Sequence, residues 1–297
     1  MRNSKSCCTV TFKDGTAVLG TVSLTNGQAT FVTSALALGN HMITAVYSAT
    51  GNFAGNTSPS LTQTVQTVAY EPDPLYAGKK ALVVGGTPGN DNILITPSWP
   101  RSYVQVNVQE TNLSRYRFSG SYDTSNVDRL MVYGGPGNDD ITVDDDITLP
   151  TLLDGGAGDD VLKGGGGPNI LIGGDGNDTL LGGSFRNLLI GGLGQDKLKA
   201  GPGQDILIGG TTNFDSNAAA LAAIMAEWSR TNLDYDDRVN HILHGGGLNG
   251  STVLNSTTIQ NDKATDILMG GSGLDLYFAS SADQLVGKTK GETVVSI

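Results

Sequence analysis

A nine-residue period constrains this chain more than any other feature. Between Gly155 and Ile208 the sequence divides without a gap into six units: GGAGDDVLK, GGGGPNILI, GGDGNDTLL, GGSFRNLLI, GGLGQDKLK and AGPGQDILI. Position eight is always leucine: Leu162, Leu171, Leu180, Leu189, Leu198 and Leu207. A strict apolar period is not a property of a flexible glycine-rich linker, so a folded repeat array is expected.

Each unit predicts a tight turn followed by a short strand. Glycine permits the positive φ and the close backbone approach that such turns need, and the last three residues alternate about an inward leucine, as a strand does. One unit cannot bury its leucine alone, so neighbouring units must stack. If two units form one coil, every second turn lies on the same side. The predicted fold is therefore mainly β, a parallel β-roll or β-helix.

Position six predicts a metal site. Its residues are acidic or amide side chains: Asp160, Asn169, Asp178, Asn187, Asp196 and Asp205. In stacked coils the aspartates of the odd units would lie roughly 4.8 Å apart, where two carboxylates repel by roughly 3 kcal/mol at an effective dielectric of about 20. A hard cation removes this repulsion. Calcium suits the site because it accepts about six to eight oxygens, from carboxylates or carbonyls, in flexible geometry.

The predicted ligands are position-six aspartates and glycines whose carbonyls are exposed in the turns. They are Asp160, Asp178, Asp196, Asp205, Asp266, Asp275, Gly156, Gly158, Gly174, Gly176, Gly192 and Gly194. An asparagine offers one weaker, uncharged ligand oxygen. We therefore expect the side of the roll with Asn169 and Asn187 to be empty or weak. Asp178 would serve two ions and Asp205 only one.

The pattern G-G-x-G-x-D-x-U-x resembles the hemolysin-type (RTX) calcium-binding repeat. The resemblance implies calcium ion binding, a β-roll, and a secreted, extracellular or cell-surface location, and it implies no catalytic activity. The sequence departs from the pattern at Phe185, which replaces the fourth glycine, and at Asn169 and Asn187, which replace aspartate.

Residues 1–68 predict a separate β domain. Alternating segments separated by turn signals predict strands at Thr9–Phe12, Ala17–Leu24, Gln28–Val32, His41–Tyr47 and Leu61–Val68. The stretch VTFKDGTAVLGTVSLTNGQATFVTSALALGNHMITAVYSATGNFAG resembles the repeated bacterial Ig-like domains of large surface proteins. The first strands of that pattern are missing, so a truncated β-sandwich is expected, with His41 in a structural role. The whole chain resembles the carboxy-terminal part of large exported planctomycete-type proteins.

The remaining chain divides by composition and period. Residues 69–80 predict a linker, 81–153 a β-helical lead-in with turns at Asp91 and Asp139, and 154–210 the calcium-binding roll. Within the lead-in, Tyr103–Val108 and Tyr116–Gly120 predict a hairpin. The run Asp144–Asp146 is interpreted as a solvated acidic turn rather than a metal site. Residues 211–260 predict a helical insertion, and 261–297 the final repeats and a closing strand.

The insertion predicts two helices. The first begins near Asp215 or Ser216, ends near Arg230, and carries an apolar stripe of Leu221, Ile224, Met225 and Trp228. The second runs from Asp234 to His244. His241 and His244 share a face but lack a third ligand, so they are interpreted as surface histidines.

The insertion also raises two questions of packing. If it loops out of the roll, the register is preserved, and Asp266 stacks on Asp196 and Asp275 on Asp205. The outward positions of the even units are all branched and apolar: Ile170, Ile172, Leu188, Ile190, Ile206 and Ile208. A solvated face does not tolerate such a patch. We predict that the first helix covers it; the alternative is a bare sheet that binds a partner.

Composition excludes several functions. The net charge of −11 argues against nucleic acid and anionic membranes, and no apolar run reaches the length of a membrane helix. Cys7 and Cys8 are adjacent and imply no disulfide framework, and the amino terminus has no apolar segment typical of a signal peptide. The expected function is a calcium-binding structural or spacer module that folds on Ca²⁺ outside the cell. An adhesin with a cell-surface or matrix partner is the alternative. A polysaccharide-active β-helix enzyme would need a catalytic constellation, and none stands out.

Overall fold

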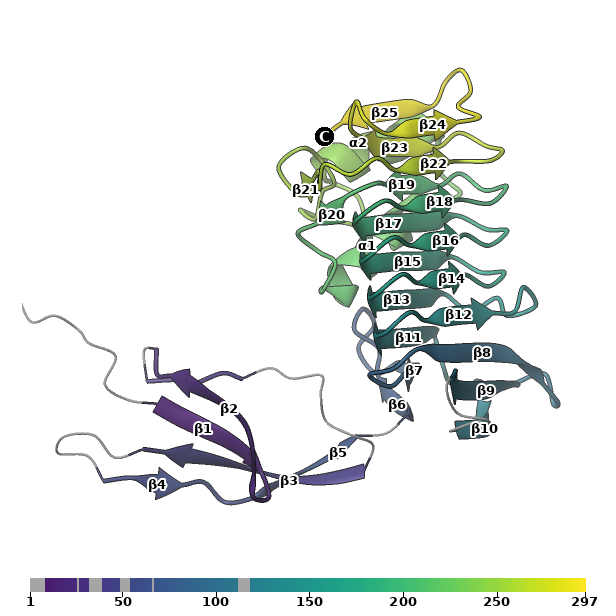
Figure 1. Cartoon of the computed structure of the whole chain (residues 1–297). Coiled ribbons are helices and arrows are strands. Elements are labelled where there is room, and N and C mark those ends of the chain that lie inside the picture. Colours follow the sequence, from purple (N-terminus) through teal and green to yellow (C-terminus); the bar gives the residue numbers. More distant parts are fainter. Residues whose placement is uncertain (1–8, 26, 32–38, 49–53, 66, 112–117) are drawn as a thin grey trace, which may run out of the picture. The chain divides into compact units, whose positions relative to one another are not determined.

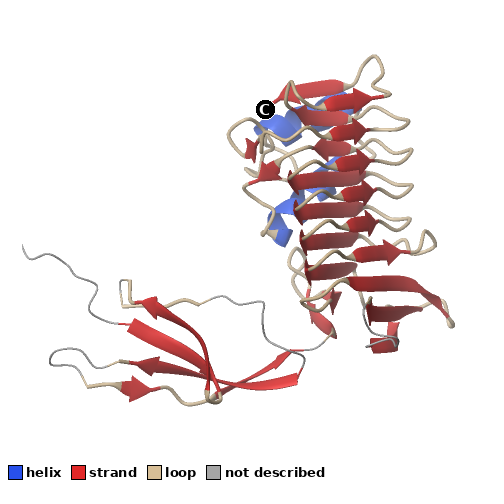
Figure 2. Ribbon diagram, in the orientation of Figure 1, coloured by secondary structure: helices blue, strands red, loops and turns tan. Residues whose placement is uncertain are grey.

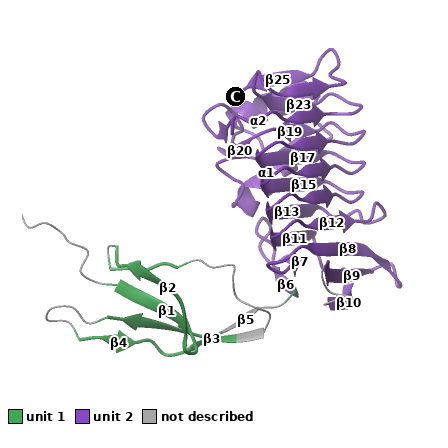
Figure 3. Cartoon of the chain, in the orientation of Figure 1, with its two compact units in different colours: residues 1–67 green, residues 68–297 purple. Residues whose placement is uncertain are grey.

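A computed structural model describes residues 9–25, 27–31, 39–48, 54–65, 67–111 and 118–297 (Figure 1). Cys7 and Cys8 lie outside these residues. Strands dominate the described chain, and its two α-helices both belong to one segment near the carboxy terminus (Figure 2). The chain forms two compact units, residues 1–67 and 68–297 (Figure 3).

The first unit is an antiparallel sheet in the residues described. Its strands are β1 (Thr9–Asp14), β2 (Ala17–Ser23), β3 (Gly39–Tyr47), β4 (Asn56–Thr57) and β5 (Leu61–Val65), in the order β2-β1-β3-β4 with β5 also paired to β3. The prediction of a strand at Gln28–Val32 is wrong for residues 28–31. Gln28 makes only an isolated bridge to Thr25. Val32 lies outside the described residues. Asp14 pairs with His41 at 2.6 Å, which confirms a structural role for this histidine.

The second unit is a β-roll built from two nine-stranded sheets. We call them the even and odd sheets, after the repeat units that form their middle strands. The even sheet contains β25 (Thr293–Ser296), β23 (Leu276–Ala279), β19 (Ile206–Ile208), β17 (Asn187–Leu193), β15 (Asn169–Asp175), β13 (Thr151–Ala157), β11 (Arg129–Pro136), β7 (Lys80–Gly85) and β6 (Val68–Pro72). The odd sheet contains β10 (Phe118–Asp123), β9 (Tyr103–Glu110), β8 (Asp91–Ser98), β12 (Asp140–Val143), β14 (Val161–Lys163), β16 (Thr179–Leu181), β18 (Lys197–Lys199), β22 (Ile267–Met269) and β24 (Gln284–Val286).

The leucines of position eight fill the space between the two sheets. All six are 0% exposed and belong to one core cluster, and Tyr277 takes the same position in a later unit. Units eighteen residues apart are neighbours, since Leu162 pairs in register with Leu180 and Leu180 with Leu198. Two units therefore make one coil, and the predicted β-roll is confirmed.

The predicted linker at residues 69–80 is wrong. β6 pairs antiparallel with β7, so this segment is a hairpin at the edge of the even sheet. Its turn is fixed by the buried carboxylate of Asp73, which accepts hydrogen bonds from the N–H groups of Leu75 and Tyr76. The same carboxylate forms a 2.8 Å ion pair with Nε of Arg129. The two prolines that suggested a linker are Pro72, at the end of β6, and Pro74, near the start of this turn. The predicted hairpin of the lead-in is confirmed as β9 and β10, with Tyr116 outside the described residues.

The insertion leaves the roll after β19. Two short antiparallel strands, β20 (Thr211–Thr212) and β21 (Ile259–Gln260), close its base, and it holds α1 (Ala218–Trp228) and α2 (Tyr235–His244). The side chain of Asn217 caps α1 by accepting from the N–H of Ala220, so this helix begins later than Asp215 or Ser216. The predicted ends of α2 are confirmed, with Asp234 as its amino-terminal cap and Gly245 at φ 85° as its carboxy-terminal cap.

The helical insertion covers the outer face of the even sheet. Ile172, Ile190 and Ile208 are at most 4% exposed and share a buried cluster with the stripe of α1. The predicted helix-on-sheet layer is confirmed, so this face is not a bare binding surface. Arg186, next to the irregular Phe185, donates hydrogen bonds to the carbonyl oxygens of Trp228 at 2.8 Å and Arg230 at 2.7 Å. Arg186, at position five of its unit, thus holds the carboxy-terminal end of α1.

Candidate metal sites

Position-six aspartates form a column along one side of the roll, which we call the odd column. Its members are Asp91, Asp139, Asp160, Asp178, Asp196, Asp266 and Asp283. The main-chain N–H of each residue donates to Oδ1 of the next, with N–O distances of 2.7 to 3.1 Å. The carboxylates predicted to stack on the odd side therefore do so, and the column extends past both ends of the six consecutive units.

One of the two oxygens of each central carboxylate has no hydrogen-bond partner in the protein. Asp139, Asp160, Asp178 and Asp196 are 1 to 2% exposed, and Oδ2 of each is buried without a hydrogen bond. An ionised oxygen buried in this way is costly unless a positive charge or a donor meets it. Each free oxygen lies beside the first glycine of its turn, as Oδ2 of Asp160 does beside Gly155, and a cation would satisfy it.

Burial shifts the protonation of these groups. It is the largest cause that raises the pKa of Asp178 to about 6, Asp160 to about 7 and Asp196 to about 8. Repulsion adds to the effect at Asp196, whose pKa is also raised by Asp178, Asp266 and Asp262. The metal-free column therefore holds protons near neutral pH, as expected of carboxylates that lack a counter-ion.

Glycine creates the space beside the column. A Cβ on Gly155 would overlap both Oδ2 of Asp160 and the carbonyl oxygen of Gly173, and the same holds one coil later for Gly173 and Asp178. The predicted carbonyl ligands at positions two and four adopt φ of 106 to 139°: Gly156, Gly158, Gly174, Gly176, Gly192 and Gly194. In the described part of the chain, no three His, Cys, Asp or Glu side chains converge as a metal cluster. A bound ion would therefore need main-chain carbonyls as well as carboxylates.

The opposite side carries a second column, the even column, which changes chemistry along its length. It begins with Asn169 and Asn187 and continues with Asp205, Asp275 and Glu292. Asn187 N–H donates to Oδ1 of Asp205 at 2.7 Å, and Asp205 N–H to Oδ1 of Asp275 at 2.8 Å. Oδ2 of both aspartates is buried and unpartnered. Burial raises the pKa of Asp205 to about 7 and that of Asp275 to about 6.

Several members of the columns were not among the predicted ligands. Asp91 and Asp139 follow glycine-rich turns, but the 21-residue step from Asp139 to Asp160 hides their register. The structure absorbs the additional residues in the loop that follows β12, where Ile147 is 5% exposed and packs into the core. Asp283 and Glu292 occupy position six of irregular units and precede β24 and β25. Their only signal is an acidic residue directly before a short strand.

A ladder of exposed polar side chains runs beside the odd column at position five. Asp159 N–H donates to Oδ1 of Asn138 at 3.1 Å, Asn177 N–H to Oδ1 of Asp159 at 2.8 Å, and Gln195 N–H to Oδ1 of Asn177 at 3.0 Å. These bonds fix the turn backbone from outside. The sequence shows them only as a preference for Asn, Asp or Gln before position six.

Other acidic and histidine residues have structural partners. Asp144 accepts from the N–H of Asp146, and Asp145 pairs with Lys163 at 3.2 Å, which agrees with a solvated acidic turn. His241 is half-buried and contacts the buried Glu227 at 2.6 Å, so it is a structural partner rather than a free surface histidine. His244 is exposed, as predicted.

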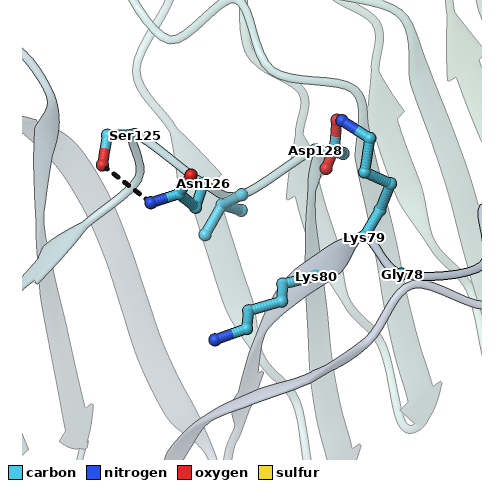
Figure 4. Close-up of a pocket in the computed structure, with 7 residues that line it drawn as sticks. Gly78, Lys79, Lys80, Ser125, Asn126 and Asp128 are labelled. Carbon is cyan, nitrogen blue, oxygen red and sulfur yellow. Dashed lines mark hydrogen bonds and ion pairs between the residues drawn. The ribbon is translucent and has the colours of Figure 1, made fainter.

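A cavity of about 410 Å³ lies between the β6–β7 hairpin turn and the segment before β11 (Figure 4). It is lined by Gly78, Lys79, Lys80, Ser125, Asn126, Val127 and Asp128. Lys79 and Asp128 neutralise each other through a 3.2 Å ion pair. Its lining contains no carboxylate of the odd column.

Comparison with protein families finds one match in each unit of the chain. Residues 154–189 and 181–213 match the RTX calcium-binding nonapeptide repeat, and residues 3–66 match the bacterial Ig-like domain, group 3. No curated protein and no solved structure matches the chain. RTX repeats are calcium-binding, so calcium is the cofactor of this repeat array. Both families are typically non-enzymatic structural modules and are common in exported proteins. No helix in the described residues is long and apolar enough to cross a membrane.

Proposed function

We propose that this chain is a structural spacer of an exported or cell-surface protein, and that calcium completes its fold outside the cell. The observation that carries the proposal is the odd column, where buried carboxylate oxygens stack coil after coil without partners. Calcium is scarce in the cytosol and abundant outside. If calcium binds the folded roll and not the unfolded chain, its binding free energy adds to the free energy of folding after export.

The proposed ions lie between neighbouring carboxylates of the predicted ligand aspartates in each column. On the odd side the pairs are Asp160 with Asp178, Asp178 with Asp196, and Asp196 with Asp266. On the even side the pair is Asp205 with Asp275. The carbonyls of positions two and four complete the oxygen set, with Gly156 and Gly158 as the first example. This arrangement neutralises the stacked charges and gives calcium the mixed carboxylate and carbonyl ligands that it prefers.

Calorimetry tests this function directly. Thermal unfolding of the full chain would be recorded in millimolar calcium, in the same concentration of magnesium, and in chelator. We expect a large rise of Tm in calcium and a small one in magnesium, because magnesium demands a compact octahedral shell that stacked turns do not provide. Equal Tm values in calcium and chelator would contradict the proposal.

A binding module is the second candidate. Trp99 is 86% exposed in the turn between β8 and β9, and Tyr76 is 50% exposed in the β6–β7 turn. Exposed aromatic side chains are common anchors for partners. Glycan and protein arrays with wild type and with Trp99→Ala would separate the two candidates, because a pure spacer should give no signal that depends on this residue.

A further inference from the structure

The amide groups of the even column make the contacts that the odd column lacks. Nδ2 of Asn169 donates to the carbonyl oxygens of Gly165 at 3.0 Å and Gly167 at 2.8 Å, and to Oδ1 of Asn187 at 2.8 Å. Gly165 and Gly167 are positions two and four of the same turn. The two amide hydrogens therefore serve two turn carbonyls and the side chain of the next coil.

Asn187 repeats this arrangement one coil later. Its Nδ2 donates to the carbonyl oxygens of Gly183 at 3.2 Å and Phe185 at 2.8 Å, again positions two and four, and to Oδ1 of Asp205 at 2.9 Å. Asn169 and Asn187 are both 0% exposed. The arrangement is therefore a repeated, buried structure rather than a chance surface contact.

The odd turns differ at the equivalent atom. Position six there is aspartate, and Oδ2 of Asp160, Asp178 and Asp196 has no partner. The carbonyls of positions two and four on that side are the ones that the ion is proposed to bind. The nitrogen of each asparagine thus contacts the same three kinds of oxygen as an ion would: two turn carbonyls and one side-chain oxygen of the next coil.

We propose that Asn169 and Asn187 replace calcium ions, so that these two RTX turns are metal-free and folded without calcium. This inference rests on the proposed function, in which the aspartate turns bind the ion. Partial positive charge on the amide hydrogens satisfies the turn oxygens, and no carboxylate needs neutralising. Calcium binding on the even side begins only where the column becomes acidic, at Asp205 and Asp275.

The position of these turns links them to the helical layer. Arg186, directly before Asn187, holds the carboxy-terminal end of α1 through the carbonyls of Trp228 and Arg230. The same turn that needs no ion therefore anchors the insertion. The acidic even turns anchor the insertion as well, because Nε1 of Trp228 donates to the carbonyl oxygen of Gln204 at 2.6 Å and the hydroxyl of Tyr235 donates to that of Asp275 at 2.7 Å.

Two reciprocal variants of the full chain test the inference. The first, Asn169→Asp with Asn187→Asp, converts two pairs of the even column into carboxylate pairs. Native mass spectrometry in saturating calcium should show about two more bound ions than wild type, one for each converted pair. In chelator its Tm should fall below that of wild type, because the amide donors are lost and buried charge is added.

The second variant, Asp178→Asn, supplies an amide on the odd side. It should bind fewer ions than wild type and have a higher Tm in chelator, since Nδ2 can donate to the turn carbonyls and to Asp196. It also decides the case if the double variant does not fold. An unchanged ion count in a folded double variant, or a lower chelator Tm for Asp178→Asn, would overturn the inference. A wild-type chain that binds no calcium would instead overturn the proposed function.

Discussion

The main-chain N–H of Asp196 donates a 2.9 Å hydrogen bond to Oδ1 of Asp266, which lies 70 residues further along the chain. Asp205 makes the equivalent 2.8 Å bond to Asp275 over the same interval. Both pairings were predicted, and both are confirmed. The whole insertion is thus looped out between two neighbouring coils, and its base is closed by β20 and β21 without a change of register.

Asp262 supplies a hydrogen-bond acceptor that the odd turns lose where the insertion interrupts the repeat. In regular coils the N–H of position four donates to a carbonyl of the next coil, as Gly158 does to Asp175 at 2.7 Å and Gly176 to Leu193 at 2.8 Å. Gly194 instead donates to Oδ2 of Asp262 at 2.8 Å. A side-chain carboxylate has taken the place of the main-chain oxygen.

We predict that Asp262→Ala destabilises the roll by about 1–3 kcal/mol, because the N–H of Gly194 loses its acceptor. Chemical denaturation at fixed calcium measures the loss. Asp146→Ala is the matched control, since it removes an exposed carboxylate and should change stability by less than about 0.5 kcal/mol. Equal effects of the two substitutions would show that Asp262 is not a structural substitute.

The helical layer gives a second prediction. Ile190 is 0% exposed between the even sheet and the insertion, whereas Val161 on the outer odd sheet is 39% exposed. Ile190→Ala should cost about 2–5 kcal/mol through lost burial and a cavity. Val161→Ala, at an outward position on the other sheet, should cost far less. Denaturant midpoints of the two variants decide, and similar losses would mean that the layer contributes little stability.

The repeat made the roll predictable from sequence. Period-nine leucines set the core, and position-six aspartates set the column, because each requirement recurs in every coil. The apolar outward positions of the even units, such as Ile172 and Ile190, predicted the helical cover for the same reason. A requirement that is met only once leaves no comparable signal in the sequence. The β6–β7 hairpin depends on a single buried ion pair between Asp73 and Arg129, and the segment looked like a linker.

The columns were harder to delimit than to detect. Asp139 was displaced from the eighteen-residue spacing by a loop, and Glu292 stands in a unit without the glycine signature. The amide arrangement of Asn169 could not be foreseen either, because a weak ligand and a replacement for the ion have the same sequence. Only the three acceptors around Nδ2 distinguish them.

The raised pKa values predict how stability depends on pH. In chelator, burial holds the pKa of Asp160 and Asp205 at about 7 and that of Asp196 at about 8, against 3.8 as the ordinary value. The folded roll therefore binds more protons than the unfolded chain between about pH 4 and pH 8. The stabilisation by these protons is complete below about pH 4 and is lost as the pH rises through 6 to 8.

We accordingly expect Tm in chelator to fall from pH 5 to pH 8, and the rise of Tm on adding calcium to grow over the same interval. The second effect follows because the ion binds carboxylates only after their protons leave. Differential scanning calorimetry at several pH values, with and without calcium, measures both. A chelator Tm that increases from pH 5 to pH 8 would show that the column carboxylates are not protonated in the metal-free roll.

The two columns predict unequal roles for Asp178 and Asp205. Asp178 lies between Asp160 and Asp196 and belongs to two carboxylate pairs, whereas Asp205 lies between the amide of Asn187 and Asp275 and belongs to one. Asp178→Ala should therefore reduce the calcium-dependent rise of Tm more than Asp205→Ala does.

In chelator, Asp205→Ala should lower Tm more than Asp178→Ala does. Asp205 accepts two hydrogen bonds from Asn187, at 2.7 and 2.9 Å, but Asp178 accepts a single such bond, at 2.7 Å from the N–H of Asp160. Melting curves of both variants in calcium and in chelator give the two differences, and equal calcium-dependent losses would count against ions shared between successive coils.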